Sequence, residues 1–372
     1  MSAASSAPVR TDNSDHEENA DDEAAPRFEF TPRKIAAFAV FAVLATLGLY
    51  LLLPQLAGLD DTWNRIEQGN PLWLVVGFCC AVGVFGGYVA LFQGVFGRAC
   101  ARRLSWRESY QITMAGLAAT RLFSAGGAGG LLLTAWALRR AGMRRQTVAD
   151  KTVSFLVLTY LVYTTALIVA GFGLHFGLLP GPDPFALTFV PAVLALILTL
   201  LGLSIALVPT DFARRMEGFA RREGRVGRLA QRLALVPATI SAGMRDALRQ
   251  IARRDPAPAG ALLFWAFQIA TLWACFHAFG ESPHMAVIVM AFFIGMLGNL
   301  LPLPGGIGGV DGGMIGAFAA FGVDTGLAVV AVLAYRGFTF WLPTLPGVIA
   351  YLQLRRTVER WRLERASQAV AT

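Results

Sequence analysis

The chain has 372 residues, of which 55% are hydrophobic and only 15% are charged, and its mean hydropathy is +0.55. Because about a quarter of the residues in a soluble domain are charged, this composition predicts an all-α protein that crosses a membrane several times. The net charge of +8 comes almost entirely from arginines in the connections between apolar runs. That distribution indicates membrane topology and contact with anionic lipid, and it argues against nucleic acid as a partner.

Neither the cysteines nor the histidines form a recognisable metal or redox motif. The four cysteines make no CxxC pattern, and the four histidines are scattered along the chain. We therefore expect no metal and no cofactor, and we interpret the cysteines as small core residues.

The N-terminal segment, residues 1–31, holds eight acidic residues and two arginines and predicts a disordered acidic tail. It lacks the basic start and the cleavage site of a signal peptide, so the first apolar run is expected to be a retained anchor. Arg27, Arg33 and Lys34 stand before that run and place the N-terminus in the cytoplasm by the positive-inside rule.

Six apolar runs are long enough to cross a bilayer as helices. They cover residues 34–55, 72–97, 152–178, 184–208, 260–280 and 325–352. Arginine-rich connections between them are assigned to the cytoplasm, and the remaining connections to the outside. Both chain ends are then cytoplasmic, and the protein is expected in the cell membrane, that is, the inner or plasma membrane.

Two further apolar segments must begin and end on the same side of the membrane. Basic clusters flank residues 110–138 at both ends, so this segment is expected to enter from the cytoplasm and return. Residues 285–324 must start and finish on the outer side. We predict six full spans plus two oppositely oriented hairpins, built as re-entrant segments or broken helices. The alternative is full crossing by two short helices.

The two hairpins share a glycine pattern. The stretches GLAATRLFSAGGAGG (116–130) and GMLGNLLPLPGGIGG (295–309) both end in GGxGG, at a constant offset of 179 residues. Weak similarity between segments of opposite orientation is typical of the inverted repeats of transporters, whose substrate site lies near the repeat interface. The pattern therefore predicts an inverted repeat.

Glycine-rich turns at membrane depth predict a cavity, because hydrocarbon offers no partners to non-helical backbone. Helices are expected to begin after Gly130 and near Asp311 or Gly312. Two helix N-termini that face one cavity favour an anion such as phosphate. Close helix packing is the alternative explanation, and the glycines taken alone favour it. Neither stretch fits a nucleotide-binding pattern.

The apolar segments contain the charged residues Arg121 in the first hairpin, Asp311 in the second, and Arg336 well inside the last span. Such residues usually line functional interiors, and two arginines with one acid make a net positive site suited to phosphate. Alternatively, Arg336 and Asp311 form a structural bridge, which leaves Arg121 uncompensated or reaching toward the cytoplasmic edge. The candidate substrate-binding residues are Arg121, Gly126, Gly127, Gly129, Gly305, Gly306, Gly308, Asp311 and Arg336.

Other polar residues are weaker candidates. Possible cavity-lining side chains are Asn299, Gln268, Tyr335 and Trp341, although Tyr and Trp more often mark the membrane interface. Arg139 and Arg140 are interpreted as topology anchors or as contacts to lipid phosphates.

Residues 209–256 contain eleven arginines. Among them, apolar residues recur at helical spacing: Phe212, Met216, Phe219, Leu229 and Leu233. The pattern predicts a basic amphipathic cytoplasmic segment on the inner leaflet, with a solvated linker as the alternative. The domain organisation is then an acidic tail, a membrane domain at 32–356 and a basic cytoplasmic tail at 357–372.

The stretch PLPGGIGGVDGG, followed by AYRGFTFWLPTLPG, resembles the membrane domain of the lysylphosphatidylglycerol synthase/flippase family. RLFSAGGAGGLLLTAWALRRAGM is similar to the upstream half of that pattern. The resemblance covers roughly residues 34–356 and implies a flippase-like domain that binds or moves a lipid with a polar headgroup. In that family the acid after PGGxGG is commonly Glu, and here it is the shorter Asp311. The aminoacyl-transferase domain of synthase members is expected to be absent, because the chain ends soon after its last apolar run.

The sequence therefore predicts a non-enzymatic membrane protein that binds an anionic phospholipid or lipid-linked headgroup and moves it between leaflets. Without an ATP motif, movement is expected to be passive or ion-coupled. The first alternative is a membrane-embedded enzyme acting on a lipid-linked substrate, which lacks a visible carboxylate pair or nucleophile–base pair in the apolar segments. The second is a scaffold that recruits partners through its acidic tail and basic loop.

Overall fold

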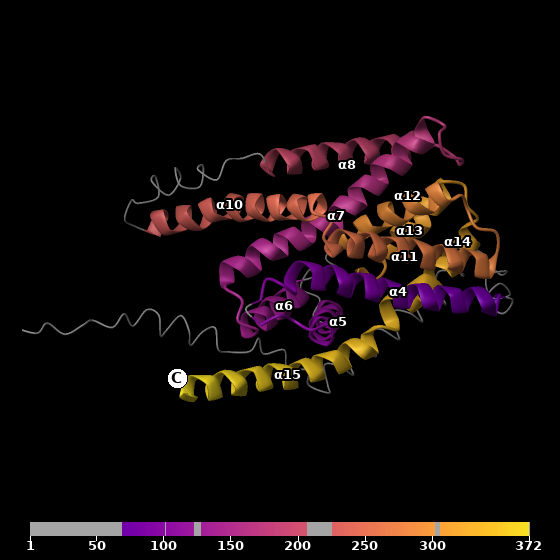
Figure 1. The fold of residues 1–372 in the computed structure, drawn as a ribbon. Helices are drawn as coiled ribbons and strands as arrows, with labels where there is room; N and C mark the ends of the chain where they lie inside the picture. Colours follow the sequence, from indigo (N-terminus) through magenta and orange to yellow (C-terminus); the bar gives the residue numbers. More distant parts are fainter. Residues whose placement is uncertain (1–68, 101, 123–127, 207–224, 302–305, 372) are drawn as a thin grey trace, which may run out of the picture.

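The computed structural model describes residues 69–100, 102–122, 128–206, 225–301 and 306–371. Every regular element in these ranges is helical (Figure 1), which confirms the predicted all-α class. Within the described ranges, five helical stretches are long and apolar enough to cross a membrane: α4 (Pro71–Phe96), α7 (Arg145–His175), α8 (Phe185–Ala206), α11 (Pro256–Phe279) and the stretch Thr325–Glu364. They correspond to five of the six predicted spans. The other predicted span, 34–55, and the acidic tail 1–31 lie outside the described residues.

Helices α4 and α11 pack closely along each other. Small residues permit this approach: a Cβ added at Gly87 would lie 2.6 Å from Phe264 N, and one at Gly94 would lie 2.7 Å from Ala257 Cα. In lipid, the tails are as apolar as the side chains, so helices associate mainly through such close van der Waals packing. Asn70 fixes the start of α4 by accepting a hydrogen bond from Leu72 N at 3.0 Å.

The sequence predicted a single span over the last apolar run, 325–352. In the structure this run is interrupted and is not one regular helix. Helix α14 (Thr325–Arg336) passes into a π-helical segment, η3 (Gly337–Trp341), and α15 (Thr344–Ala371) follows. Pro343 and Pro346 have no N–H to donate, so the regular hydrogen-bond ladder cannot continue through them. The break lies close to the middle of the predicted span 325–352.

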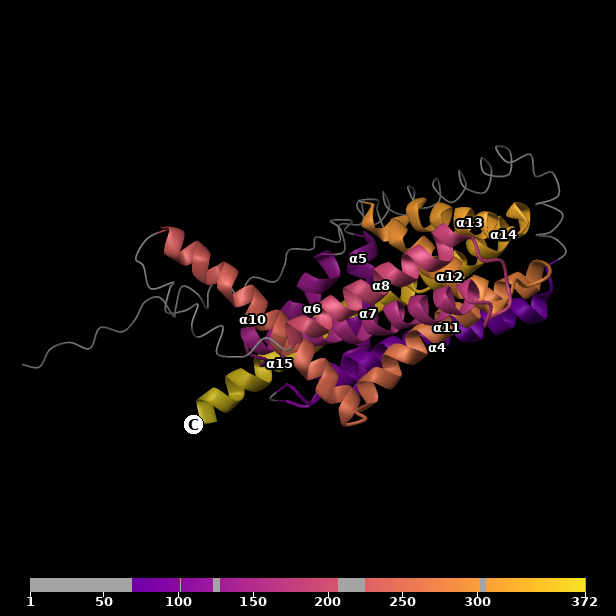
Figure 2. The ribbon, with the colours of Figure 1, turned by 90° about the horizontal axis from the view of Figure 1, so that it is seen from above.

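Each predicted hairpin is a pair of short helices. Helix α5 (Trp106–Leu122) packs against α6 (Ala128–Arg140), and α12 (Met285–Met296) packs against α13 (Gly309–Ala320). A short 3₁₀ turn, η1 (Leu297–Leu300), extends α12. In Figures 1 and 2 the pair α5/α6 lies toward one end of the bundle and the pair α12/α13 toward the other.

The same order of elements occurs twice along the chain. Helix α12 begins at Met285, 179 positions after Trp106 begins α5, which is the offset of the GGxGG stretches. The series α4 to α7 thus corresponds to the series from α11 to α14 and α15. Helix α5 packs on α15, and α12 packs on α7. Interchanging the two halves maps each of these contacts onto the other, as a pseudo-two-fold relation between repeats requires.

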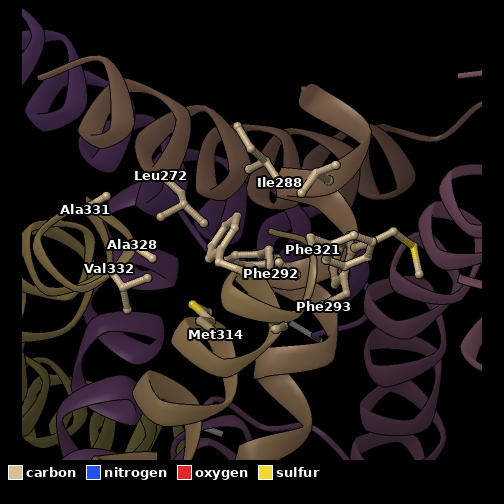
Figure 3. Close-up of a cluster of buried hydrophobic side chains, with 14 of the residues drawn as sticks. Leu272, Ile288, Phe292, Phe293, Met314, Phe321, Ala328, Ala331 and Val332 are labelled. Atoms are coloured by element: carbon tan, nitrogen blue, oxygen red, sulfur yellow. The ribbon is translucent and has the colours of Figure 1, made fainter. Parts of the chain in front are cut away.

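Two clusters of buried apolar side chains accompany the two hairpins. One gathers around α5 and α6 and extends to α15. The other gathers around α12, α13 and α14, where Phe292, Phe293 and Met314 are fully buried (Figure 3). Helices α7 and α11 contribute to both clusters. Each cluster therefore combines side chains from both halves of the chain.

Helices α8 and α10 (Arg225–Ala252) form an insertion between the halves, and α10 packs on α7 and α8. A salt bridge of 2.9 Å between Lys151 and Asp246 joins α10 to α7. Part of the predicted amphipathic segment 209–256, with Phe212, Met216 and Phe219, lies outside the described residues, whereas Leu229 and Leu233 belong to α10. The predicted tail 357–372 continues α15 as a helix up to Ala371.

Candidate functional site

The turn of the second hairpin is built around glycines with left-handed backbone. Gly306 and Gly308 have φ values of +68° and +81°, which residues with a side chain rarely adopt. Helix α13 begins directly afterwards at Gly309, so it starts two residues earlier than the predicted Asp311. Asp311 is instead in the first turn, where its Oδ2 accepts a hydrogen bond from Gly308 N at 2.8 Å. This helix N-terminus therefore already holds an anion, the carboxylate of the chain itself.

The same carboxylate pairs with Arg336 at the end of α14. The Nε atom of Arg336 lies 2.6 Å from Oδ1 of Asp311, and their side chains are 13% and 5% exposed. This is the structural bridge that the sequence left as an alternative. Because both charges are buried, loss of either partner would leave the other without compensation, at a cost of about 3–5 kcal/mol.

Arg121, near the end of α5, contacts the π-helical segment of the other half. Its Nη2 donates to the carbonyl of Thr339 at 2.9 Å and its Nη1 to the carbonyl of Phe340 at 2.7 Å. Pro343 cannot supply the N–H that the Thr339 carbonyl would receive in a regular helix, and the guanidinium takes its place. In the part of the chain that the structure describes, Arg121 contacts carbonyl and hydroxyl oxygens and no carboxylate. It is therefore hydrogen-bonded, which the sequence did not predict, yet its charge is not paired there.

Phe340 connects the two arginines. The Cζ atoms of Arg121 and Arg336 lie 5.0 and 4.6 Å from the centroid of its ring. Both positions allow cation–π attraction, which strengthens when the cation is desolvated. We call Arg121, Asp311, Arg336 and Phe340 the polar centre. It combines two guanidinium groups and one carboxylate, and it is built from both halves of the chain.

Several of the described glycines in the hairpins serve packing. A Cβ at Gly130 would lie 2.5 Å from the carbonyl oxygen of Gly116, and one at Gly298 would lie 2.5 Å from Val310 N. Each contact joins the two helices of one hairpin, as the packing alternative requires. Gly129 and Gly130 lie inside α6, which begins at Ala128 and not after Gly130 as predicted. The candidates Gly126, Gly127 and Gly305 lie outside the described residues.

The weaker candidates do not form a common wall. Tyr335 donates its hydroxyl hydrogen to Gln268 Oε1 at 2.6 Å, and both side chains are buried. Asn299 is exposed beside the turn of the second hairpin, and Trp341 is half-buried. Arg139 and Arg140 end α6. The sequence reasoning missed Thr339, Phe340 and Pro343, although the proline-interrupted stretch FTFWLPTLP signals backbone carbonyls that need an outside donor.

The family model described as the lysylphosphatidylglycerol synthase TM region matches residues 35–347. The chain belongs to this family. The matched residues include the whole polar centre and both hairpins, so the resemblance seen in the glycine and arginine motifs is confirmed. This lysylphosphatidylglycerol synthase TM family member is therefore a multi-pass membrane protein.

Curated relatives match over shorter stretches. Two UPF0104 membrane proteins of Methanothermobacter thermautotrophicus are 36% and 38% identical to the chain, over 87 and 89 residues. These matches cover 23% and 24% of this chain and 25% and 27% of the relatives. A UPF0104 membrane protein of Methanocaldococcus jannaschii is 29% identical over 97 residues, 26% of this chain and 29% of that protein. The chain thus spans about a quarter of the length of the relatives that it matches.

Proposed function

We propose that the polar centre binds the phosphate of an anionic phospholipid or lipid-linked headgroup, and that the protein moves this lipid between the two leaflets. The observation that carries the proposal is the charge of the centre: two buried arginines accompany one carboxylate in its described part. In an environment of low dielectric constant, an excess cation is costly and attracts an anion more strongly than it would in water.

Arg121 is the residue expected to bind the phosphate. Its hydrogen bonds to two carbonyl oxygens and the Thr344 hydroxyl use three of the five N–H donors of a guanidinium. Hydrogen bonds between ionised partners are roughly twice as strong as neutral ones, so a phosphate oxygen competes well with a carbonyl. Arg336, held by Asp311, also contacts the Phe340 ring and adds positive potential there.

The place of the centre suits translocation. Arg121 comes from the first hairpin and Asp311 from the second, so the site lies where the two halves meet. Transporters built from repeats place their substrate sites at such an interface and expose them alternately. In this proposal, the glycine-packed hairpins move as units relative to each other, and the proline break after η3 is where the last run bends. Movement without an ATP site is passive or ion-coupled.

A transport role is favoured over catalysis by the state of Asp311. Both of its oxygens are engaged, one by Arg336 and one by Gly308 N, so the carboxylate is poorly placed to accept a proton from a substrate. The relatives are named only as membrane proteins. We propose a non-enzymatic protein of the inner or plasma membrane with both chain ends in the cytoplasm, as the arginine-rich connections indicate.

The test is transbilayer movement in vesicles. The purified protein would be placed in phosphatidylcholine vesicles that contain fluorescent phosphatidylglycerol or fluorescent phosphatidylcholine, and dithionite would report the outer-leaflet fraction over time. Arg121→Gln should slow movement of the anionic lipid at least tenfold, or about 1.4 kcal/mol, and Arg121→Lys should recover part of it, because it keeps the charge but loses the planar fork.

Arg253→Gln is the matched control, because Arg253 is an exposed arginine after α10 and far along the chain from the polar centre. It should leave the rate unchanged. Thermal unfolding in detergent would show that each variant folds. A wild-type protein that moves neither lipid, or a folded Arg121→Gln variant with the wild-type rate, would rule out the proposed function.

A further inference from the structure

An apolar groove of about 400 Å³ lies between α4, α5 and the start of α15. Its lining from α4 occupies one helical face, with the spacing i, i+3, i+4 and i+7: Phe78, Ala81, Val82 and Phe85. From α5 come Tyr110 and Met114, one turn apart. The third wall is formed by Leu342, Pro343, Leu345 and Pro346. The volume falls within the range of roughly 300–1,000 Å³ typical of small-molecule sites.

The groove lies at hydrocarbon depth along α4. Phe78 and Phe85 follow Pro71, the first residue of this 26-residue helix, by about 10 and 21 Å at 1.5 Å per residue. A bilayer core is about 30 Å thick, so this stretch is the middle of the span. Val82 is 57% and Leu345 73% exposed, so the groove is open at its side. At this depth an open apolar groove faces hydrocarbon chains and not water.

One wall of the groove also holds Arg121. Pro343 lies between Phe340 and Thr344, whose oxygens are 2.7 and 3.4 Å from Nη1 of Arg121. On α5, Met114 and Arg121 are seven residues apart and therefore on the same face, about 10 Å apart along the axis. The apolar groove and Arg121, which has no carboxylate partner among the described residues, thus share the segment around Pro343.

The shape of this wall is fixed by packing and by proline. A Cβ at Gly347 would lie 2.9 Å from Ala118 Cβ and 3.0 Å from Met114 O, so α15 and α5 approach closely directly beneath the groove. The rings of Pro343 and Pro346 restrict the backbone on either side of Leu345. The groove is therefore preformed, which lowers the entropy cost of filling it.

We infer that this groove holds one acyl chain of a phospholipid whose phosphate is bound at Arg121. The inference rests on the proposed function and names its substrate as a chain-bearing phospholipid. A preformed apolar groove beside a guanidinium that meets no carboxylate in the described ranges matches a molecule that carries an anionic head and an apolar chain. A headgroup without a chain would use only the polar end of this surface.

The test is photocrosslinking with a phosphatidylglycerol that carries a diazirine in one acyl chain, in phosphatidylcholine vesicles containing the full chain. Label should concentrate on the groove segments of α4 and on residues 342–346. Val82→Trp should fill the groove and reduce this labelling several-fold, together with the rate of anionic-lipid movement. Val75→Trp is the matched control, because Val75 is another valine of α4, 58% exposed, and outside the groove.

A phosphatidylcholine with the same diazirine distinguishes a bound substrate from bulk lipid. Labelling of the groove should be several-fold stronger with phosphatidylglycerol, and Arg121→Gln should remove that preference. Equal labelling by both lipids, absence of label at the groove, or labelling insensitive to Val82→Trp would overturn the inference. Anionic-lipid movement without groove labelling would leave the proposed function standing, whereas selective labelling without movement would support the groove and reject translocation.

Discussion

The two hairpins are built alike and differ in what they bring to the polar centre. Each is a pair of short helices joined through glycines, and each packs on a long helix of the opposite half. The second hairpin contributes Asp311, which caps its own helix and pairs with Arg336. The first contributes Arg121, whose partners are backbone carbonyls of the other half. The two hairpins are therefore packed alike, but the first brings a cation, Arg121, to the polar centre and the second brings an anion, Asp311.

This difference separates a charged group that stabilises the fold, Asp311, from one that can bind a ligand, Arg121. In the second hairpin, the charged group is committed twice, to the helix N-terminus and to Arg336. In the first, the charged group replaces a donor that Pro343 removes and retains an unpaired charge in the described structure. We therefore expect changes in the second hairpin to act mainly on stability, and changes at Arg121 to act mainly on lipid binding.

The largest effect is expected from Asp311→Ala. The change removes the partner of a buried arginine and the cap of α13, and it should lower the free energy of unfolding by about 3–5 kcal/mol. Arg336→Leu alone should have a similar cost, because it leaves the carboxylate unpaired. The double variant Asp311→Ala/Arg336→Leu should be more stable than either single variant. Unfolding in detergent would measure all three, and strictly additive losses would contradict the commitment of Asp311 to Arg336.

A smaller loss is expected where glycines join the helices of each hairpin. Gly298→Ala places a Cβ against the backbone of α13, and Gly130→Ala places one against the backbone of α5, so each should cost about 1–3 kcal/mol. Gly316→Ala is the control, since a Cβ there meets nothing within 4 Å and alanine favours the helix. Equal stability of all three variants would contradict the packing role of Gly298 and Gly130, and a loss in only one hairpin would contradict their equivalence.

The sequence was sufficient for the scaffold because its signals are local. Apolar length gave the described spans, and charge at the flanks separated α5/α6 and α12/α13 from them. The offset between glycine stretches matched the offset between α5 and α12. The first predicted span and three of the candidate glycines fall outside the described residues, and the sidedness of the hairpins in the membrane stays a prediction.

The polar centre could be predicted only in part, because its contacts are made between helices far apart in the chain. The depth of Arg121, Asp311 and Arg336 in apolar runs identified them, and their pairing was one of two alternatives. Nothing local in the sequence indicates that Arg121 reaches the carbonyl of Thr339, which is 218 residues away. The prolines after η3 indicate that carbonyls one turn earlier lack a helical donor. That Arg121 is the donor depends on the packing of α5 on α15, which the sequence does not show.

The α5–α15 and α7–α12 interfaces are equivalent in the two halves, but loss of one hydrogen bond should cost more stability in the first than in the second. On α5 and α15, the Thr357 hydroxyl donates to Gln111 Oε1 at 2.9 Å in a buried position, whereas on α7 and α12 the Tyr163 hydroxyl donates to the Phe293 carbonyl at 2.5 Å. Thr357→Val leaves a buried amide oxygen short of a partner and should cost about 1–3 kcal/mol. Tyr163→Phe removes a donor from a carbonyl inside a helix and should cost about 1 kcal/mol. The reverse order, measured by unfolding in detergent, would show that the first interface is the more tolerant one.

The smallest effect is expected at the insertion, which belongs to neither half. Burial raises the pKa of Asp246, but hydrogen bonds from Lys151, Ser154 and Gln250 outweigh it and hold the pKa below its ordinary value of 3.8. A carboxyl whose pKa is lowered by folding stabilises the protein above its unfolded pKa, and this contribution is lost as the pH falls through the folded value. Because the pair is partly exposed, Asp246→Asn should cost less than about 1 kcal/mol at neutral pH. The difference from wild type should begin to shrink as the pH falls below about 4 and should vanish only below the folded pKa of Asp246. Lys151→Gln should produce the same loss of stability, and the double variant Lys151→Gln/Asp246→Asn should lose no more than either single variant. A difference that persists in acid would mean that the carboxylate charge is not what fastens α10 to α7.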